Sequence, residues 1–299
     1  MPRHHFRGEI LLFITALIWG TSFVAQRVGM ERIGPFTFTA SRFLIGALSL
    51  LVFILITGAT GAAARPSSPA SHRADLLKGG LACGLALFMA ISFQQFGLQY
   101  TSAGKAGFIT ALYILLVPVF GLFLRKNVSP RVWLGVILAI TGLYLLTVTE
   151  GFSIGRGDLI VLCGTVFWAV HILVIDHFAA KVEASKLSFL QFLIAGVISA
   201  AVAGAVEVME FSAIWKSAAP ILYAGVVVVG IAYTLQVFGQ KHASPSIAAI
   251  ILSLESVFAV LSGMLLLGET LTGREIAGCI LMFAAVLIAE IKPRSANPR

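Results

Sequence analysis

The sequence predicts an all-α transmembrane protein of ten helices, arranged as two five-helix inverted repeats. Three observations lead to this prediction. The composition is too apolar for a soluble protein, the chain contains ten apolar runs of membrane-spanning length, and its two halves resemble each other.

Composition already limits the class of protein. Of the 299 residues, 59% are hydrophobic and 11% are charged, and the mean hydropathy is +0.98. Soluble domains carry about 25% charged residues, so a soluble fold could not bury this much apolar surface. The same figures exclude a disordered chain, and three cysteines are too few for a disulfide scaffold. The protein is therefore expected to lie in a membrane.

Ten apolar runs follow one another along the chain, and each is long enough for a tilted spanning helix. They cover residues 9–28, 35–57, 76–98, 103–124, 131–149, 157–178, 186–207, 213–238, 243–267 and 274–291. Pro35, Pro130 and Pro245 stand at or near the starts of three runs, where the missing N–H of proline costs little. The runs are continuous rather than alternating, which favours helices over a β-barrel.

The basic residues predict how the chain is oriented. The formal net charge is +8. With ten helices both termini lie on one side, and the segments on that side carry 14 basic residues against 6 on the other. The positive-inside rule then places both termini in the cytoplasm. The positive charge therefore indicates how the chain is oriented in the membrane. Membrane lipids are expected as partners of the basic residues, and no nucleic-acid partner is expected.

The two halves of the chain align with each other at offsets of 149 and 142 residues. Identical pairs include Trp19 with Trp168, Phe43 with Phe192, and Gln94 with Gln236. We therefore divide the chain into two repeats, residues 1–150 and 151–299, with five helices each. Because five is an odd number, the second repeat enters the membrane from the opposite side. This plan recurs in secondary transporters, and it also occurs in channels.

Four stretches of the chain carry a resemblance to a known family. They are ALIWGTSFVAQR (16–27), SRFLIGALSLL (41–51), GVILAITGLYLL (135–146) and LESVFAVLSGMLLLGETLTGREIAG (254–278). These stretches resemble the EamA domain of the drug/metabolite transporter superfamily, and two such units cover nearly the whole chain. The resemblance implies an EamA-like carrier fold in a bacterial inner membrane, commonly that of an exporter of amino acids or other small metabolites. The whole chain is similar to exporters of the YddG type, which move amino acids including aromatic ones.

Arg42 and Glu255 are ionisable residues deep inside predicted helices. Arg42 lies seven residues after Pro35, and Glu255 lies twelve residues after Ala243. Because a charge inside the bilayer is costly, such residues are functional candidates. Glu255 could hold a substrate ammonium group, carry a proton in coupled transport, or form a structural hydrogen bond to a neighbouring helix. Arg42 could bind a substrate carboxylate or tie helices together through backbone carbonyls.

Aromatic and amide side chains form a second set of candidates, because they would build the walls of a small-molecule site. The predicted substrate-binding residues of this set are Trp19, Gln95, Tyr113, Trp168, His171, Tyr233 and Gln236. Tyr113 is the repeat counterpart of Glu255. The two Trp rings could face an ammonium group or pack against neighbouring helices. His171 fits a structural hydrogen-bonded group better than a proton relay.

We therefore predict a secondary transporter that exports amino acids, including aromatic ones, and related small metabolites by alternating access. A multidrug or other metabolite carrier of the same superfamily is the alternative within transport. An intramembrane lipid-modifying enzyme is a weaker alternative, because the six His residues are scattered along the chain. No catalytic residue, metal ion or cofactor is expected, since no Walker A, Rossmann or zinc signature occurs.

Overall fold

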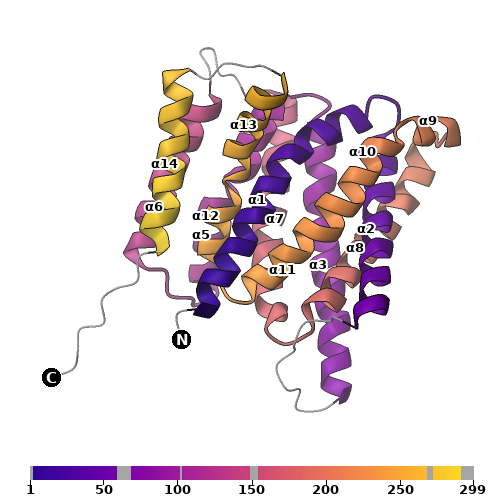
Figure 1. Cartoon of the computed structure of the whole chain (residues 1–299), viewed down its shortest axis with the longest axis horizontal. Coiled ribbons are helices and arrows are strands. Elements are labelled where there is room, and N and C mark those ends of the chain that lie inside the picture. Colours follow the sequence, from indigo (N-terminus) through magenta and orange to yellow (C-terminus); the bar gives the residue numbers. More distant parts are fainter. Residues whose placement is uncertain (1–2, 59–68, 102, 149–153, 268–271, 291–299) are drawn as a thin grey trace.

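The computed structural model describes residues 3–58, 69–101, 103–148, 154–267 and 272–290. Within these ranges every regular element is a helix, which confirms the predicted all-α class. The helices stand side by side in one bundle (Figure 1). The predicted boundary between the two halves, at residue 150, lies outside the described residues.

Several of the shorter helices follow one another end to end. In chain order the elements are α1 (Arg3–Gly29), α2 (Pro35–Thr57), α3 (Pro69–Gly97), α4 (Ala103–Ala111), α5 (Tyr113–Phe123), α6 (Pro130–Thr147), α7 (Arg156–Ala179), α8 (Ala184–Val206), α9 (Phe211–Lys216), α10 (Ala218–Leu222), the π-helical η1 (Tyr223–Tyr233), α11 (Thr234–Gln240), α12 (Pro245–Leu252), α13 (Glu255–Leu267) and α14 (Gly273–Glu290).

Helix starts agree with the prediction where the sequence supplies a start signal. Helix α2 covers the predicted run 35–57, and α6, α7 and α8 begin and end within two residues of their runs. The three predicted prolines occupy the first turns of α2, α6 and α12. In α6 and α12 the preceding Ser129 and Ser244 also accept a hydrogen bond from a backbone N–H of the first turn, as helix-capping residues do.

Several helices are suited to a membrane by length and composition. The described chain contains seven such segments: Pro35–Ile56, His72–Gly97, Ala106–Phe123, Arg156–Ala179, Ala184–Val206, Ala218–Gln240 and Pro245–Ser262. A shorter apolar helix covers Pro130–Leu146. The chain is therefore built to cross a membrane many times, and the total of ten crossings stays a prediction.

Three predicted runs change helical geometry along their length, although each contains a segment long enough to cross a membrane. Run 103–124 is divided at Leu112 into α4 and α5, and run 243–267 is divided after Leu252 into α12 and α13. Run 213–238 becomes the series α9, α10, η1 and α11. At the first two divisions the backbone tightens into i→i+3 hydrogen bonds of the 3₁₀ type, such as Leu115 N to Leu112 O at 3.0 Å.

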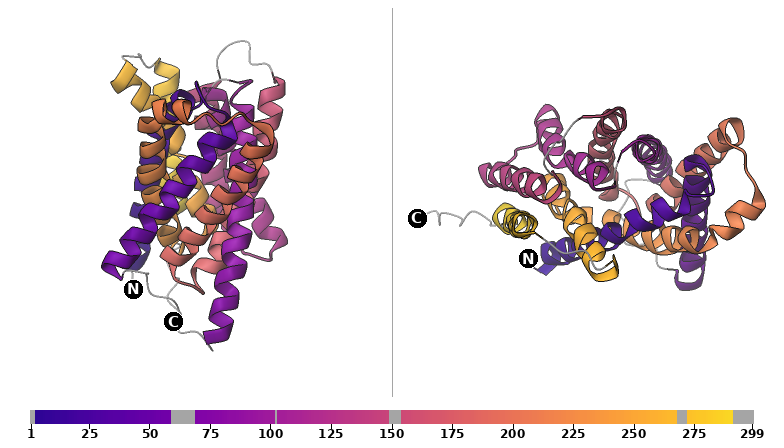
Figure 2. Two further views of the ribbon diagram at one scale, coloured as in Figure 1. Left: turned by 90° about the vertical axis from the view of Figure 1, so that its right-hand side faces the viewer. Right: turned by 90° about the horizontal axis from the view of Figure 1, so that it is seen from above.

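The bundle has two ends, the terminal end and the opposite end. Helix α1 begins, α2 ends and α3 begins at the terminal end, near the chain's N-terminus (Figure 1). Helix α1 ends and α2 begins at the opposite end. Helices α2, α3, α7 and α8 pack on one another, and α6 packs with α14. Helix α1, the η1–α11 segment and the α12–α13 segment run between these groups (Figure 2).

Charged side chains join helices at the terminal end. His72 Nε2 of α3 lies 2.8 Å from Glu183 Oε2, and Lys186 Nζ donates to Glu183 Oε1 at 2.8 Å. Lys126, which follows α5, pairs with Asp176 of α7. Burial raises the pKa of Glu183, but the hydrogen bonds from Lys186 and His72 outweigh it, so this pKa lies below its usual range. Polar contacts thus hold α3, α5, α7 and α8 together here.

Helices α6 and α14 approach so closely that only glycine fits at their contact. A Cβ atom on Gly142 would lie 2.7 Å from the carbonyl oxygen of Gly278, and a Cβ on Gly278 would lie 2.6 Å from the carbonyl oxygen of Gly142. Both distances are shorter than van der Waals contact. The two backbones therefore touch, as in other closely packed membrane helices.

We expect Gly142→Ala to lower the free energy of unfolding by about 1–3 kcal/mol, because the added methyl group forces the two backbones apart. Thermal unfolding of the purified protein in detergent measures this. Gly204→Ala is the matched control, since a Cβ there meets only the Met209 side chain, at 3.7 Å, and a helical Gly→Ala change stabilises by about 0.5–1 kcal/mol. Equal stability of the two variants would contradict the close contact.

Candidate functional site

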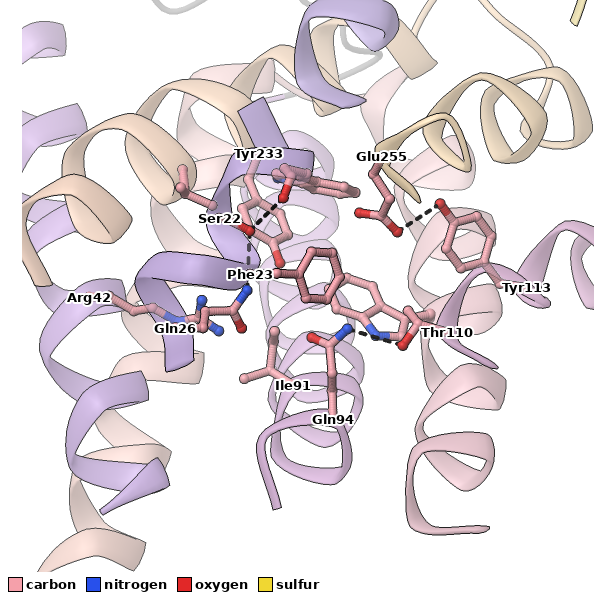
Figure 3. Close-up of a pocket in the computed structure, with 13 residues that line it drawn as sticks. Ser22, Phe23, Gln26, Arg42, Ile91, Gln94, Thr110, Tyr113, Tyr233 and Glu255 are labelled. Carbon is pink, nitrogen blue, oxygen red and sulfur yellow. Dashed lines mark hydrogen bonds between the residues drawn. The ribbon is translucent and has the colours of Figure 1, made fainter. Parts of the chain in front are cut away.

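A central cavity draws on residues from both halves of the chain. Its lining comes from α1, α2, α3, α4, α5, α7, η1 and α13 (Figure 3). The lining residues are Trp19, Ser22, Phe23, Gln26, Arg42, Ile91, Gln94, Thr110, Tyr113, Trp168, Val228, Tyr233 and Glu255. Six of the predicted substrate-binding residues are among them: Trp19, Arg42, Tyr113, Trp168, Tyr233 and Glu255.

The cavity extends from the middle of the bundle toward the opposite end. Trp168 lies near the midpoint of α7. Gln26 and Gln94, by contrast, are each three residues from the helix ends at the opposite end. Arg42 is seven residues into α2, which starts there. The polar lining residues therefore lie in the middle and in the half that faces away from the chain's N-terminus.

Aromatic rings from five elements meet at Tyr233, at the inner limit of the cavity. The ring centroid of Tyr233 lies 4.6 Å from that of Trp19 and 6.3 Å from that of Trp168. It also lies 6.0 Å from Phe43 and 6.1 Å from Phe192. We call these five residues the aromatic contact. Spacings of 4.5–7 Å are those of favourable ring pairs, so the contact joins α1, α2, α7, α8 and η1.

Both Trp side chains at the aromatic contact keep a polar atom without a partner. The indole Nε1 atoms of Trp19 and Trp168 are buried, and neither meets a hydrogen-bond acceptor within the described ranges. Buried donors of this kind are rarely left unsatisfied in a finished core. Both residues line the cavity, so their indole N–H groups are the donors that it offers beside the ring faces.

The cavity carries one cationic and one anionic side chain. Arg42 is 1% exposed, and its Nε and Nη2 atoms have no hydrogen-bond partner in the part of the chain that the structure describes. Its guanidinium carbon lies 5.4 Å from the ring centre of Phe38 and 5.2 Å from that of Phe43. The faces of these two rings compensate for only part of the hydration that the Arg42 guanidinium loses on burial.

Glu255 lies on the other side of the cavity from Arg42 (Figure 3). It is 5% exposed, and its Oε1 atom accepts a long hydrogen bond of 3.5 Å from the Tyr113 hydroxyl. The helix divisions explain this geometry, because Tyr113 is the first residue of α5 and Glu255 the first residue of α13. Neither charged side chain forms an ion pair with another described residue.

The remaining polar lining side chains satisfy one another in pairs. Gln26 Nε2 donates to Ser22 Oγ at 3.1 Å, and Gln94 Nε2 donates to Thr110 Oγ1 at 3.1 Å. None of these four residues is among the predicted substrate-binding residues. Two signals point to them: Ser22 and Gln26 share a face of α1 with Trp19 at i+3 and i+7 spacing, and Gln94 is the repeat counterpart of the selected Gln236.

Three predicted substrate-binding residues do not line the cavity. Gln95 lies behind its wall and donates from Nε2 to the side chain of Gln26. His171 is fully buried, with Nε2 2.8 Å from Gln191 Oε1. Gln236 is fully buried in α11. In this conformation a cavity-bound molecule would reach none of the three directly, and their role as substrate contacts stays a prediction.

The cavity is narrow. Its volume is only about 20 Å³. That is room for about one ordered water, whereas pockets for small organic ligands measure roughly 300–1,000 Å³. The helices must therefore separate before an organic solute can enter. No cluster of three or more metal-ligating residues occurs in the described chain.

A helical bundle with several membrane-length segments and a buried polar cavity defines a multi-pass membrane protein with a solute site. Comparison with known proteins identifies it further. The sequence profile of the EamA-like transporter family matches residues 6–148 and again residues 155–290. The chain belongs to this family, and it is a membrane transporter.

The relatives of this chain are named as transporters and not as enzymes. The chain is 32% identical over 286 residues to an uncharacterized transporter of Archaeoglobus fulgidus, covering 95% of this chain and 86% of that protein. It is 26% identical over 288 residues to the uncharacterized inner membrane transporter YedA of Escherichia coli, covering 93% and 89%. A protein of known crystal structure shares the fold with a TM-score of 0.78 at 20% identity, covering 95% and 96% of the two chains.

The unpaired indole N–H at the aromatic contact leads to a stability prediction. We expect Trp168→Phe to change the free energy of unfolding by less than about 1 kcal/mol, because the ring stays and an unsatisfied donor is removed. Trp168→Ala is expected to lose about 3–5 kcal/mol through the space it leaves. Thermal unfolding in detergent compares the two, with Trp215→Ala as a neutral control because Trp215 is 71% exposed. A large loss in the Phe variant would contradict the unpaired donor.

Proposed function

We propose that this protein is a secondary transporter that exports amino acids, including aromatic ones, and related small metabolites by alternating access. One observation carries the proposal. One buried cavity contains Arg42 and Glu255, neither of which has an ion-pair partner among the described residues, with aromatic rings between them. This combination complements a zwitterion with an apolar side chain.

Arg42 is the proposed partner of the substrate carboxylate. A buried guanidinium whose donors are unsatisfied is unfavourable, because its lost hydration is not replaced. Arg42 leaves two donor atoms free within the described chain. A carboxylate would satisfy these donors through charge-assisted hydrogen bonds, which are among the strongest in proteins.

Glu255 and the ring faces are the proposed environment of the substrate ammonium group and side chain. The hydrogen bond from Tyr113 occupies only one carboxylate oxygen of Glu255, and at 3.5 Å it is weak. The rings of Trp19, Trp168 and Tyr233 offer faces to a cation and flat apolar surface to an aromatic side chain. An amino acid with a large apolar side chain uses all of these groups at once.

The proposed architecture has ten spanning helices in two inverted repeats, residues 1–150 and 151–299. The double family match over 6–148 and 155–290 supports this division. Contacts between repeat-equivalent residues support a shared axis: Trp19 with Trp168 at 6.1 Å and Phe43 with Phe192 at 6.2 Å. Two related halves that meet at the site can exchange roles, which is the basis of alternating access in such repeats.

The proposed location is a bacterial inner membrane with both termini in the cytoplasm. The resemblance to an inner membrane transporter of Escherichia coli supports the membrane. The excess of basic residues at the terminal end supports the orientation. With this orientation, the cavity extends toward the side away from the cytoplasm.

A multidrug or other metabolite carrier is the second candidate function. The number of ring surfaces in the cavity favours it, because Phe23, Tyr113, Tyr233 and both Trp residues would accept many flat cations. The two candidate functions predict different roles for Arg42, because an organic cation gains no favourable interaction from a guanidinium group.

Uptake into proteoliposomes tests the proposed substrate class. Purified protein is reconstituted, and uptake of radiolabelled phenylalanine and leucine is measured against unlabelled competitors, with empty liposomes as background. We expect saturable uptake that other amino acids compete for. Uptake of a cationic dye without uptake of any amino acid would favour the second candidate and refute amino acid transport.

Arg42→Gln is expected to lower kcat/KM for amino acid uptake about 10- to 100-fold, which corresponds to losing a charged hydrogen bond of about 1.5–3 kcal/mol. Uptake of an amine that lacks the carboxylate should not fall. Arg32→Gln is the control, because Arg32 is exposed at the opposite end. An equal loss with amino acid and amine would point to a structural role for Arg42.

Glu255→Gln is expected to lower kcat/KM for amino acids about tenfold, because the neutral amide cannot pair with an ammonium group. Uptake measured across a range of pH values tests proton coupling in the same variant, since a carboxylate that carries the proton also sets the pH dependence. Glu31→Gln, at an exposed position, serves as control. Full transport by Glu255→Gln at every pH would contradict both roles.

A further inference from the structure

Five buried polar side chains lie between the aromatic contact and the terminal end. They are His171 of α7, Ser188 and Gln191 of α8, and Gln236 and Gln240 of α11. We call them the terminal-half cluster. Each lies within eight residues of the end of its helix at the terminal end, or about 12 Å along the helix axis. They therefore occupy the half of the bundle that the central cavity does not enter.

Six atoms of the terminal-half cluster have no hydrogen-bond partner within the described part of the chain. They are His171 Nδ1, Ser188 Oγ, Gln191 Nε2, Gln236 Nε2, Gln236 Oε1 and Gln240 Oε1. Each such atom costs about 1–3 kcal/mol when it is buried. A permanent core would replace these residues with apolar ones, so the cluster indicates a region that water reaches in another conformation.

The cluster continues from the cavity across the aromatic contact. His171 follows Trp168 by three residues, and the two rings are 5.9 Å apart. Gln236 and Gln240 follow Tyr233 at i+3 and i+7, which places them on the same helix face. The amide of Gln240 reaches α7, where it donates to the carbonyl oxygen of Ile172 at 2.9 Å.

Repeat-equivalent positions link the cluster to the lining of the cavity. At the offsets of 149 and 142 residues, polar lining residues of the first half correspond to members of the cluster. The pairs are Ser22 with His171, Arg42 with Gln191, and Gln94 with Gln236. In an inverted repeat, equivalent residues stand on opposite sides of the midplane, so the cluster occupies the position that the open half of the cavity occupies now.

An apolar layer lies between the terminal end and three members of the cluster, His171, Ser188 and Gln191. Ile175, Ala179, Val182, Leu187 and Val237 are fully buried and pack together. Ion pairs of Glu183 and of Lys126 lie at the same end. Because these five side chains are fully buried, the layer has to separate before water reaches His171, Ser188 and Gln191 from this end.

We propose that the terminal-half cluster lines the closed half of the transport pathway, along which polar solute passes when the terminal end opens. The proposal rests on the alternating access proposed above. All five side chains are amides, a hydroxyl and an imidazole, which both donate and accept hydrogen bonds. They can therefore hydrogen-bond to both the carboxylate and the ammonium group of a zwitterion, but they bind these groups less strongly than Arg42 or Glu255 does. A solute in this half is therefore released more easily.

Cysteine accessibility tests the proposal without assuming a substrate. The three free cysteines, Cys83, Cys163 and Cys279, are replaced by Ala. Ser188→Cys and Gln236→Cys report on the cluster, and Ser188→Cys exchanges only oxygen for sulfur, which preserves the fold. Ser22→Cys reports on the cavity. Ala169→Cys is the buried control, because Ala169 is fully buried and packs in the apolar core beside Trp168.

A membrane-impermeant thiol reagent is applied from each side of oriented vesicles. We expect Ser188→Cys and Gln236→Cys to react at least tenfold faster than Ala169→Cys, and only from the side of the terminal end. Ser22→Cys should react from the other side. Rates no faster than that of Ala169→Cys, or labelling from the same side as Ser22→Cys, would overturn the proposal. If the cysteines are labelled from the expected sides but no amino acid is taken up, the proposed pathway stands and only the proposed substrate class is refuted.

Discussion

Tyr233 packs against aromatic rings from four other helices, and the rest of the structure is organised around this contact. It lies at the inner limit of the cavity, where Trp19 and Trp168 reach it from the two halves of the chain. On one side lie the charged groups of the cavity, and on the other lies the terminal-half cluster. Ring pairs separated by 4.6–6.3 Å are favourable. In the proposed pathway, this layer of rings separates the central cavity from the terminal-half cluster.

Arg42 and Glu255 are stabilised very little by the protein itself. A membrane protein gains no hydrophobic energy by placing charges in its core, and each unpaired ion costs free energy. Under the proposed function, a solute that supplies the counter-charges offsets this cost. The same logic covers the two indole N–H groups that have no partner within the described residues. The polar cavity is thus less stable than a fully apolar core would be, and this supports the proposal that it binds a charged solute.

Much of the fold and of the candidate site could be predicted from the sequence, but the direction in which each side chain points could not. Composition and run length predicted the helices, and prolines at the first turn fixed the starts of α2, α6 and α12. The divisions at Leu112 and after Leu252 carry neither Gly nor Pro, so no local signal marks them. Gln94 and Gln95 differ by about 100° around one helix, and only the packing of neighbouring helices decides that Gln94 faces the cavity.

The charges of the cavity are not symmetric, and this bears on the transport cycle. Under the proposed repeat, Arg42 corresponds to Gln191 and Glu255 corresponds to Tyr113, so each charged residue has a neutral counterpart. Two halves that exchange roles therefore do not offer equal sites. In the proposed pathway, a solute meets a guanidinium in the half toward the opposite end and amides in the other half. Under this proposal binding strength differs between the two open forms, so the protein loads at one affinity and releases at another without any bound ion. The proposed inverted repeat supplies the motion, and the unequal charges supply the difference in affinity.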